Sequence, residues 1–377
     1  MLISKLLVSL LFVAFALNHI NAGNDENGTY TNPEQYEIVD LKEKSEKPRN
    51  IILFIGDGVG VSQINAALTA NGGKLNLNHM KHIGFSETQS ADNYVTDSSA
   101  GGSAIATGQR IDNGAVAMDA EGNEIPTILQ YSNENNKSTG IVVSCAITHA
   151  TPASFYAHQP SRNNYEEIAE DLLSNDIDIF IGGGLEHFNQ REDGRDLTVD
   201  LANKGYTIFS SLDDGIMDTQ KPIAVFTHEG HPPRFNERGD LIPQATAKAI
   251  EVLNKNEEGF FLMVEGAQID WGGHANSTSY IIGEMLDMDR AIGEALKFAA
   301  EDGETLVIVT SDHETGGMAL HGGDAETGTV TAEYTTGGHT GVMVPTFAYG
   351  PGAELFMGIY HNTEIFFKMM NLFHFDY

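Results

Sequence analysis

The stretch Asn50-Ile-Ile-Leu-Phe-Ile-Gly-Asp57 is an unbroken apolar run that ends in a carboxylate. It lacks the alternation of a half-buried strand, which indicates a strand buried on both faces. Two other runs have the same form, from Phe260 to Glu265 and from Thr305 to Asp312-His313. Ligands of open α/β sheets bind at the carboxyl ends of the strands, so these end residues predict one shared site.

Short apolar runs alternate with longer helical patterns along the chain. They fall at 50–56, 140–145, 177–182, 223–227, 260–264, 305–310 and 342–349. Buried strands separated by helices predict an α/β fold, with a large, mostly parallel central sheet covered by helices on both faces. We find no internal repeat and no clear linker, so we expect a single domain at 49–377. A Gly- and Thr-rich surface excursion is expected at about 316–338.

The first residues predict export. Lys5 precedes an apolar run of about a dozen residues that is followed by Ala22, the pattern of a signal peptide at 1–22, and the run is too short to span a bilayer. Residues 23–48 are polar and indicate an exposed leader. After cleavage near Ala22 the protein would be periplasmic or extracellular.

Composition excludes some functions. The formal net charge of −32 repels nucleic acids and anionic membranes, so no nucleic-acid partner is expected, and most of the acidic residues are read as a solvated surface. Cys145 is the only cysteine, so no intramolecular disulfide can form. Its apolar surroundings favour a small, inert buried residue over a reactive thiol.

The turn Gly56-Asp-Gly-Val-Gly-Val61 resembles a dinucleotide fingerprint only in part, because Val61 occupies the third glycine position. Asp57 fits two readings equally well, a metal ligand or an Asx-turn. Other metal-ligand residue types recur in Asp270-Trp-Gly-Gly-His274, in Asp312-His313 and at His339. Each alone is more often an ordinary polar residue or pair. Together they offer mixed oxygen and nitrogen ligands, which suit zinc and could hold two ions.

A harder cation site is suggested by Thr151 and Glu265, whose oxygen atoms suit Mg²⁺. His149 is a less natural magnesium ligand and could act through a water. The candidate nucleophile is Ser98 at the start of a small-residue helix, where backbone amides would stabilise a phosphoryl group. In isolation, Asp97 or Ser98 would be read as a helix N-cap. Arg162 could grip two phosphate oxygens, although alone it would be read as a surface arginine.

Taken together, these motifs resemble the alkaline phosphatase family. The ordered matches are the Gly-Asp-Gly turn, Thr-Asp-Ser, His-Ala-Thr-Pro-Ala-Ser-Phe-Tyr-Ala-His, Val-Glu-Gly-Ala-Gln-Ile-Asp-Trp-Gly-Gly-His, Thr-Ser-Asp-His-Glu-Thr-Gly-Gly and Gly-Gly-His. The resemblance implies a three-layer sandwich that hydrolyses phosphate monoesters through a phosphoserine, using two Zn²⁺ and one Mg²⁺.

The resemblance also implies residue roles. Ser98 would be the nucleophile, Arg162 the phosphate clamp, and Asp97 would position both. One zinc would take Asp270, His274 and His339, and the second would take Asp312 and His313. Asp57 would bridge the second zinc and the magnesium, which Thr151 and Glu265 complete. Where some members have Asp and Lys, this chain has His149 and Trp271. The carboxylate lost at His149 puts the identity or tightness of the third metal in doubt, and the ammonium lost at Trp271 removes a positive charge near phosphate.

Three alternatives remain open. A two-zinc phosphodiesterase would not need Thr151 and Glu265, and a sulfatase would need a modified cysteine motif that is absent. A noncatalytic metal- or phosphate-binding protein would not need Asp97, Ser98 and Arg162. The family often forms homodimers, so a homodimer is possible here, but no stretch of sequence identifies an interface.

Overall fold

In the computed structural model, ten strands form one central sheet in the order β15-β3-β14-β9-β2-β8-β4-β5-β7-β6. Neighbouring strands are parallel, except that β14 runs antiparallel to both β9 and β3. The structure describes residues 29–32, 37–38, 47–212, 215–216 and 222–376, so the expected signal peptide lies outside it. The strands are β2 (Asn50–Gly56), β3 (His82–Glu87), β4 (Ser138–Ala146), β5 (Ile179–Gly183), β6 (Thr207–Phe209), β7 (Ile223–Phe226), β8 (Phe260–Gly266), β9 (Thr305–Thr310), β14 (Val344–Tyr349) and β15 (Gly358–His361).

The central strands are buried on both faces, as their apolar runs predict. In β2, Ile52 and Phe54 belong to one hydrophobic core, whereas Ile51, Leu53 and Ile55 belong to another. All five side chains are fully buried. Because successive side chains of a strand point to opposite faces, the two cores lie on opposite sides of the sheet.

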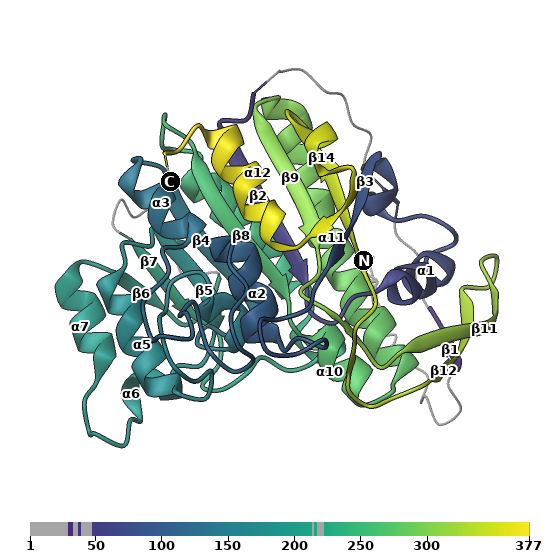
Figure 1. Ribbon diagram of the computed structural model, residues 1–377, viewed down its shortest axis with the longest axis horizontal. Coiled ribbons are helices and arrows are strands. Elements are labelled where there is room, and N and C mark those ends of the chain that lie inside the picture. Colours follow the sequence, from purple (N-terminus) through teal and green to yellow (C-terminus); the bar gives the residue numbers. More distant parts are fainter. Residues whose placement is uncertain (1–28, 33–36, 39–46, 213–214, 217–221, 377) are drawn as a thin grey trace, which may run out of the picture.

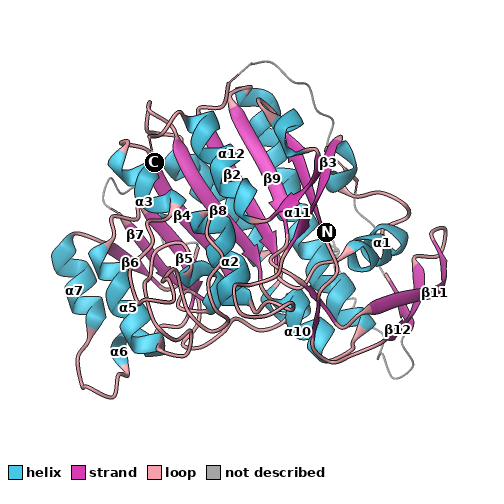
Figure 2. Ribbon diagram, in the orientation of Figure 1, coloured by secondary structure: helices cyan, strands magenta, loops and turns pink. Residues whose placement is uncertain are grey.

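Helices cover both faces and complete three layers, which confirms the predicted architecture (Figure 2). One core takes residues from α1 (Val61–Ala70), α9 (Leu241–Leu253) and α11 (Thr278–Asp302). The other takes residues from α2 (Ser98–Thr107), α3 (Ile128–Glu134), α5 (Tyr165–Ser174), α7 (Leu197–Lys204) and α12 (Thr363–Phe373). Shorter helices are α4 (Ala150–Ala153), α6 (Glu186–Asn189), α8 (Phe235–Arg238) and α10 (Gln268–His274), with η1 (Asn76–His79) and η3 (Ala353–Phe356). None of the helices in the described part of the chain combines the length and apolarity needed to cross a membrane.

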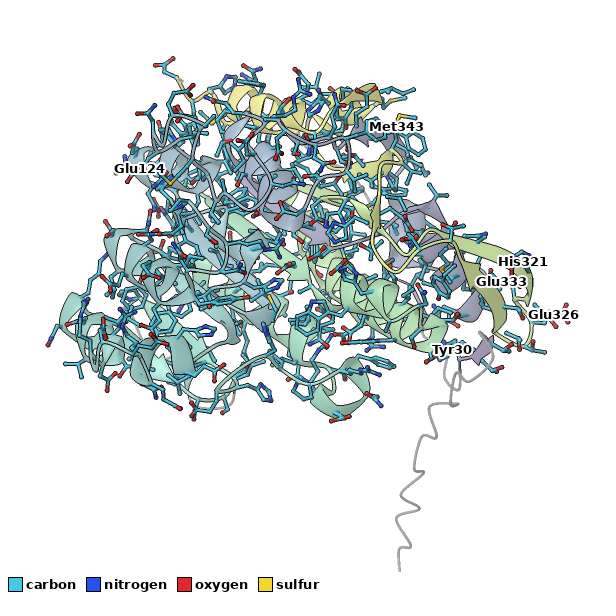
Figure 3. All side chains as sticks on the ribbon, turned by 60° about the horizontal axis from the view of Figure 1, so that its bottom comes forward. Tyr30, Glu124, His321, Glu326, Glu333 and Met343 are labelled. Atoms are coloured by element: carbon cyan, nitrogen blue, oxygen red, sulfur yellow. The ribbon has the colours of Figure 1, made fainter. Side chains whose placement is uncertain are left out.

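The Gly- and Thr-rich segment is more regular than its sequence suggests. It forms the antiparallel strands β11 (Met318–Asp324) and β12 (Thr329–Tyr334), and β1 (Thr29–Thr31) of the polar leader pairs with β12. This small sheet extends from the main body, with His321, Glu326 and Glu333 on it (Figure 3). Tyr30 is only 3% exposed, so the expectation of an exposed leader is wrong at this residue. A two-stranded pairing of β10 (Glu314–Thr315) with β13 (His339–Thr340) returns the chain to the main body.

Candidate metal centre

Polar residues gather where three adjacent strands of the central sheet end. β2 pairs with β8 on one side and with β9 on the other. Asp57 follows β2, Glu265 lies near the end of β8, and Asp312 lies two residues beyond β9. All three carboxylates are fully buried. In Figure 1, α10 lies beyond this end of the sheet, and it brings Asp270 and His274 to the same place.

A glycine turn lets Asp57 enter this cluster. Gly58 has φ +76°, a conformation that L side chains rarely adopt, and a Cβ there would lie 2.8 Å from Cα of Asp270. Neither carboxylate oxygen of Asp57 accepts a hydrogen bond from the described residues, and the Val59 amide donates to Ser311 Oγ instead. The Asx-turn reading of Asp57 is therefore wrong.

Asp270, His274 and His339 form one group of possible metal ligands. His274 Nε2 lies 3.3 Å from Asp270 Oδ2 and 3.2 Å from His339 Nε2. The Nδ1 atoms of the two rings lie 2.8 Å from Gly337 O and 2.9 Å from Thr96 O, respectively. A ring that donates from Nδ1 to a carbonyl presents the Nε2 lone pair to a metal, so both histidines are oriented as metal ligands are.

His313 is the centre of a second group. Its Nε2 atom lies 3.2 Å from Asp312 Oδ2 and 3.5 Å from Asp57 Oδ1. Burial lowers the pKa of His313 well below its ordinary value, so the ring is neutral and can offer a lone pair. Asp57, Asp270 and His313 also place one donor atom each within 4.8 Å of one another. The two groups therefore adjoin each other through Asp270.

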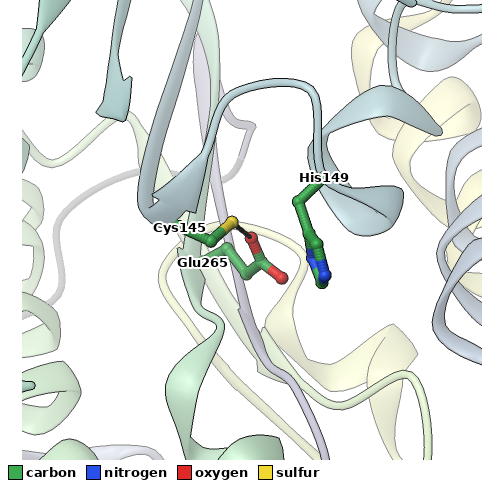
Figure 4. Close-up of side chains that lie close together, drawn as sticks. All are labelled: Cys145, His149 and Glu265. Carbon is green, nitrogen blue, oxygen red and sulfur yellow. Dashed lines mark hydrogen bonds between the residues drawn. The ribbon is translucent and has the colours of Figure 1, made fainter. Parts of the chain in front are cut away.

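The third group comes from β4, from β8 and from the N-cap of α4. Cys145, His149 and Glu265 place donor atoms within 4.8 Å of one another, as Figure 4 shows. Burial lowers the pKa of His149 to about 3, so this ring is also neutral. Thr151 is buried in the first turn after His149, in α4. Trp271 is half-buried, with its ring 6.0 Å from the His149 ring.

The buried carboxylates of the site have strongly shifted pKa values. Burial, followed by the charges of nearby carboxylates, raises the pKa of Asp57 well above its ordinary value. Burial likewise raises the pKa of Asp312 to about 7 and that of Glu265 to about 8. Burial would also raise the pKa of Asp270, but its hydrogen bond with His274 and the nearby histidine charges hold that pKa low. Several buried carboxylates packed this closely are typical of cation sites.

Buried polar atoms without a hydrogen-bond partner indicate whether the site can accommodate cations. Both oxygens of Asp57, Oδ2 of Asp312 and Oε1 of Glu265 have no hydrogen-bond partner among the described residues. Such atoms cost about 1–3 kcal/mol each when they stay unpaired, so native sites usually supply a partner. The oxygen and nitrogen donors at the first two groups match zinc chemistry. The residues present therefore fit bound metal ions.

Ser98 lies against the second group. It is the first residue of α2, it is 2% exposed, and its Oγ lies 3.3 Å from His313 Nε2. Gly101 permits this approach, because a Cβ there would lie 2.9 Å from the backbone oxygen of Asp312. The N-terminus of α2 therefore faces the buried cluster, and the positive end of its helix dipole favours an anion there.

Asp97 both caps α2 and pairs with Arg162. Its Oδ1 accepts from the Ala100 amide at 3.0 Å, which confirms the N-cap reading for this residue. Its Oδ2 lies 3.0 Å from Arg162 Nη1. The N-cap reading therefore does not exclude a role for Asp97 in the site, because one carboxylate makes both contacts.

Sequence reasoning missed three residues around the site. Thr315 Oγ1 donates to Asp270 Oδ1 at 2.5 Å and lies 3.2 Å from His313 Nδ1, so it links the first two groups. Ser311 Oγ donates to the backbone oxygen of His313. His231 contacts Trp271 with ring centroids 4.9 Å apart. Thr315 and Ser311 adjoin Asp312-His313 in sequence, which was an available signal, whereas no spacing connects His231 with the site.

Known proteins are similar to this chain in sequence and in fold. The family described as alkaline phosphatase matches residues 48–336. Alkaline phosphatase 3 of Bacillus subtilis is 31% identical, with 86% of this chain and 88% of the relative covered. Alkaline phosphatase of Escherichia coli K12 is 32% identical, with 86% of each chain covered.

Solved structures agree with the sequence relatives. The alkaline phosphatase of the Antarctic bacterium TAB5 is 40% identical and superposes with a TM-score of 0.84, covering 89% of this chain and all of its own. A cold-active alkaline phosphatase of Shewanella sp. is 29% identical with a TM-score of 0.79, covering 86% of this chain and 99% of its own. Since the family match spans most of the chain and these relatives cover it nearly end to end, the protein belongs to the alkaline phosphatase family and is a phosphomonoesterase.

Proposed function

We propose that this enzyme hydrolyses small-molecule phosphate monoesters through a phosphoserine at Ser98, with two zinc ions and a third cation. The contact between Ser98 Oγ and His313 Nε2 carries the proposal, because it joins a helix-terminal hydroxyl to a buried group of metal-ligand side chains. A hydroxyl in that position can be activated by a cation without a histidine base.

The ligand sets follow the three groups. Asp270, His274 and His339 would hold one zinc, and Asp57, Asp312 and His313 the second. Asp57, Thr151 and Glu265, with His149 directly or through a water, would hold the third cation, which the sequence resemblance implies is Mg²⁺. When bound, the cations would supply Lewis-acid stabilisation of charge on the phosphoryl and leaving-group oxygens. A His-to-Glu mutant of the TAB5 enzyme has Mg bound in its M3 site, which supports a third cation in this family member.

The side chains outside the ligand sets bind and orient the substrate. Arg162 would grip phosphate oxygens, with Asp97 holding its guanidinium beside the nucleophile helix. Ser98 would attack phosphorus and release the alcohol, after which water would hydrolyse the phosphoserine. Trp271 is a half-buried neutral side chain at the edge of the third group, so it adds no positive charge beside phosphate.

Export of the enzyme is part of the proposal. The basic, apolar and small-residue pattern of 1–22 supports a signal peptide with cleavage near Ala22 and a periplasmic or extracellular location. The single domain at 49–377 and a possible homodimer likewise remain predictions from the sequence.

A comparison of substrates tests the proposed activity. The value of kcat/KM for an aryl phosphate monoester should exceed that for the matching diester, and chelation should abolish the monoester activity. Restoring zinc with magnesium should recover it. A preference for the diester would move the function to a phosphodiesterase, and phosphate binding without turnover would favour a noncatalytic binding protein.

A further inference from the structure

We infer that Cys145 is a ligand of the third cation and that Cys145, His149 and Glu265 together select a Zn²⁺-like ion over Mg²⁺. The inference rests on the proposed function, because it concerns the same metal centre. Cys145, which the sequence alone predicts to be an inert core residue, would then be a metal-binding thiol.

The strand register aims the thiol at Glu265. In the parallel pairing of β4 with β8, Val143 lies opposite Glu265, and Cys145 is two residues further along the same face of β4. Cys145 Sγ lies 3.3 Å from Glu265 Oε2. Figure 4 shows the thiol on one side of the carboxylate and the His149 ring on the other. Two neighbouring strands therefore hold a sulfur and a carboxylate in contact.

Unpartnered buried atoms provide independent evidence for a ligand. Glu265 Oε1 and His149 Nδ1 have no hydrogen-bond partner among the described residues. Glu265 is fully buried, and His149 is 8% exposed. These two polar side chains lie beside the thiol, and both need a partner. A cation bound by these side chains would satisfy them.

The donor types decide between the two cations. Mg²⁺ takes oxygen ligands in an octahedron and does not favour sulfur or imidazole. Zn²⁺ takes sulfur, nitrogen and carboxylate oxygen in a tetrahedron, with donor atoms about 3.3–3.8 Å apart. The three donors already lie within 4.8 Å of one another, so small side-chain rotations would bring them to that spacing. A fourth position would remain for Asp57 or a water.

Cobalt binding tests the inference directly, because Co²⁺ reports a sulfur ligand by a thiolate-to-metal charge-transfer band in the near ultraviolet. The chelated full-length enzyme would be titrated with Co²⁺ while its absorption is recorded. We expect the band in the parent enzyme and its loss in Cys145→Ser. Because Cys145 is the only cysteine, no other residue can produce the band. His274→Ala serves as the matched control, since it removes a ligand of another group and should keep the band.

Bound metal provides a second measurement. After equilibration with zinc and excess magnesium, the parent enzyme should retain Zn²⁺ at all three positions, whereas Cys145→Ser should exchange the third zinc for magnesium. Absence of the band in the parent enzyme, or equal metal contents in parent and variant, would overturn the inference. The parent measurement does not depend on the folding of any variant.

Activity distinguishes this inference from the proposed function. Chelation-sensitive monoester hydrolysis without a thiolate band would reject the role of Cys145 and keep the phosphatase mechanism. A band in a protein without turnover would reject the proposed mechanism and keep the thiol ligand.

Discussion

The carboxylate of Asp97 holds the guanidinium of Arg162, with Oδ2 3.0 Å from Nη1, while it also caps the helix that begins at Ser98. The Gly114 amide and the Ser99 hydroxyl donate to the same carboxylate at 3.1 and 3.0 Å. One side chain therefore fixes the proposed clamp relative to the proposed nucleophile, although 65 residues separate Asp97 from Arg162 in sequence.

Asp97→Asn should weaken substrate binding more than folding. Asparagine can still cap α2, but it loses the charge that holds Arg162, a contact worth about 1.5–3 kcal/mol. We expect kcat/KM to fall about tenfold or more, mainly through KM. Asp196→Asn is the matched control, because Asp196 caps α7 by accepting from Thr198. An unchanged KM in Asp97→Asn would contradict the role of this ion pair.

Gly101→Ala should damage the site although alanine favours helices. The new Cβ would lie 2.9 Å from the backbone oxygen of Asp312, so α2 would move away from the metal-ligand cluster. Overpacking of this kind costs about 1–3 kcal/mol, and kcat should fall with it. At Gly102 a Cβ would lie 3.1 Å from the Ser154 hydroxyl and 3.6 Å from Thr151 Cα, an ordinary van der Waals distance, so Gly102→Ala is the comparison. Equal kcat values in Gly101→Ala and Gly102→Ala would show that close packing against Asp312 is not the cause of any fall in kcat.

Arg238→Met should destabilise the fold through a buried ion network. Arg238 Nη2 bonds Asp287 at 2.7 Å and also pairs with Glu284, and the three side chains are each 1% exposed. Removing the cation leaves the buried carboxylate of Glu284 without a guanidinium partner, while Asp287 keeps Arg290, so we expect a cost of about 3–5 kcal/mol in the free energy of unfolding. Urea denaturation would measure this loss, with Arg49→Met as the partly exposed control, expected to cost at most about 1 kcal/mol. A similar loss in the free energy of unfolding for Arg238→Met and Arg49→Met would show that the ion pairs of Arg238 with Glu284 and Asp287 do not stabilise the fold as a buried network.

The metal-free enzyme should become less stable as pH rises. Burial raises the folded-state pKa of Glu265 to about 8 and of Asp312 to about 7, above unfolded values of about 4. Below about pH 6.5 the buried rings of His149 and His313 oppose this trend, because their folded-state pKa values are lowered and the unfolded histidines bind more protons. Between about pH 6.5 and 8 the two carboxylates make the unfolded chain bind fewer protons than the folded one, so the free energy of unfolding falls as pH increases. Bound cations should remove this slope. Melting temperatures of chelated and metal-loaded enzyme at several pH values between about 6.5 and 8 would test it, and parallel curves would contradict the prediction.

The central fold could be predicted because its strands are buried on both faces. All seven apolar runs fall in strands, and the site residues follow the ends of three of them. β3 was missed because His82-Ile-Gly-Phe-Ser-Glu87 mixes polar and apolar residues and is only partly buried. The antiparallel direction of β14 could not be foreseen, since an apolar run carries no information about strand direction.

Site contacts were harder to foresee than site residues. Acids and histidines at strand ends can be found by inspection, but the contact of Cys145 with Glu265 depends on the register of β4 against β8. The same holds for Thr315, whose hydroxyl reaches Asp270 only because α10 folds back onto the strand ends. Residue type and spacing predicted which residues to consider, whereas tertiary pairing decides what each one touches.

Trapping of the phosphoenzyme would show whether Ser98 is the nucleophile. Enzyme quenched in acid during turnover of a phosphate monoester would be digested and its peptides analysed by mass spectrometry. We expect one added phosphoryl group on the peptide that contains Ser98, and loss of both the phosphopeptide and turnover in Ser98→Ala, with metal content unchanged. Full turnover by Ser98→Ala, or a phosphoryl group on another residue, would contradict it.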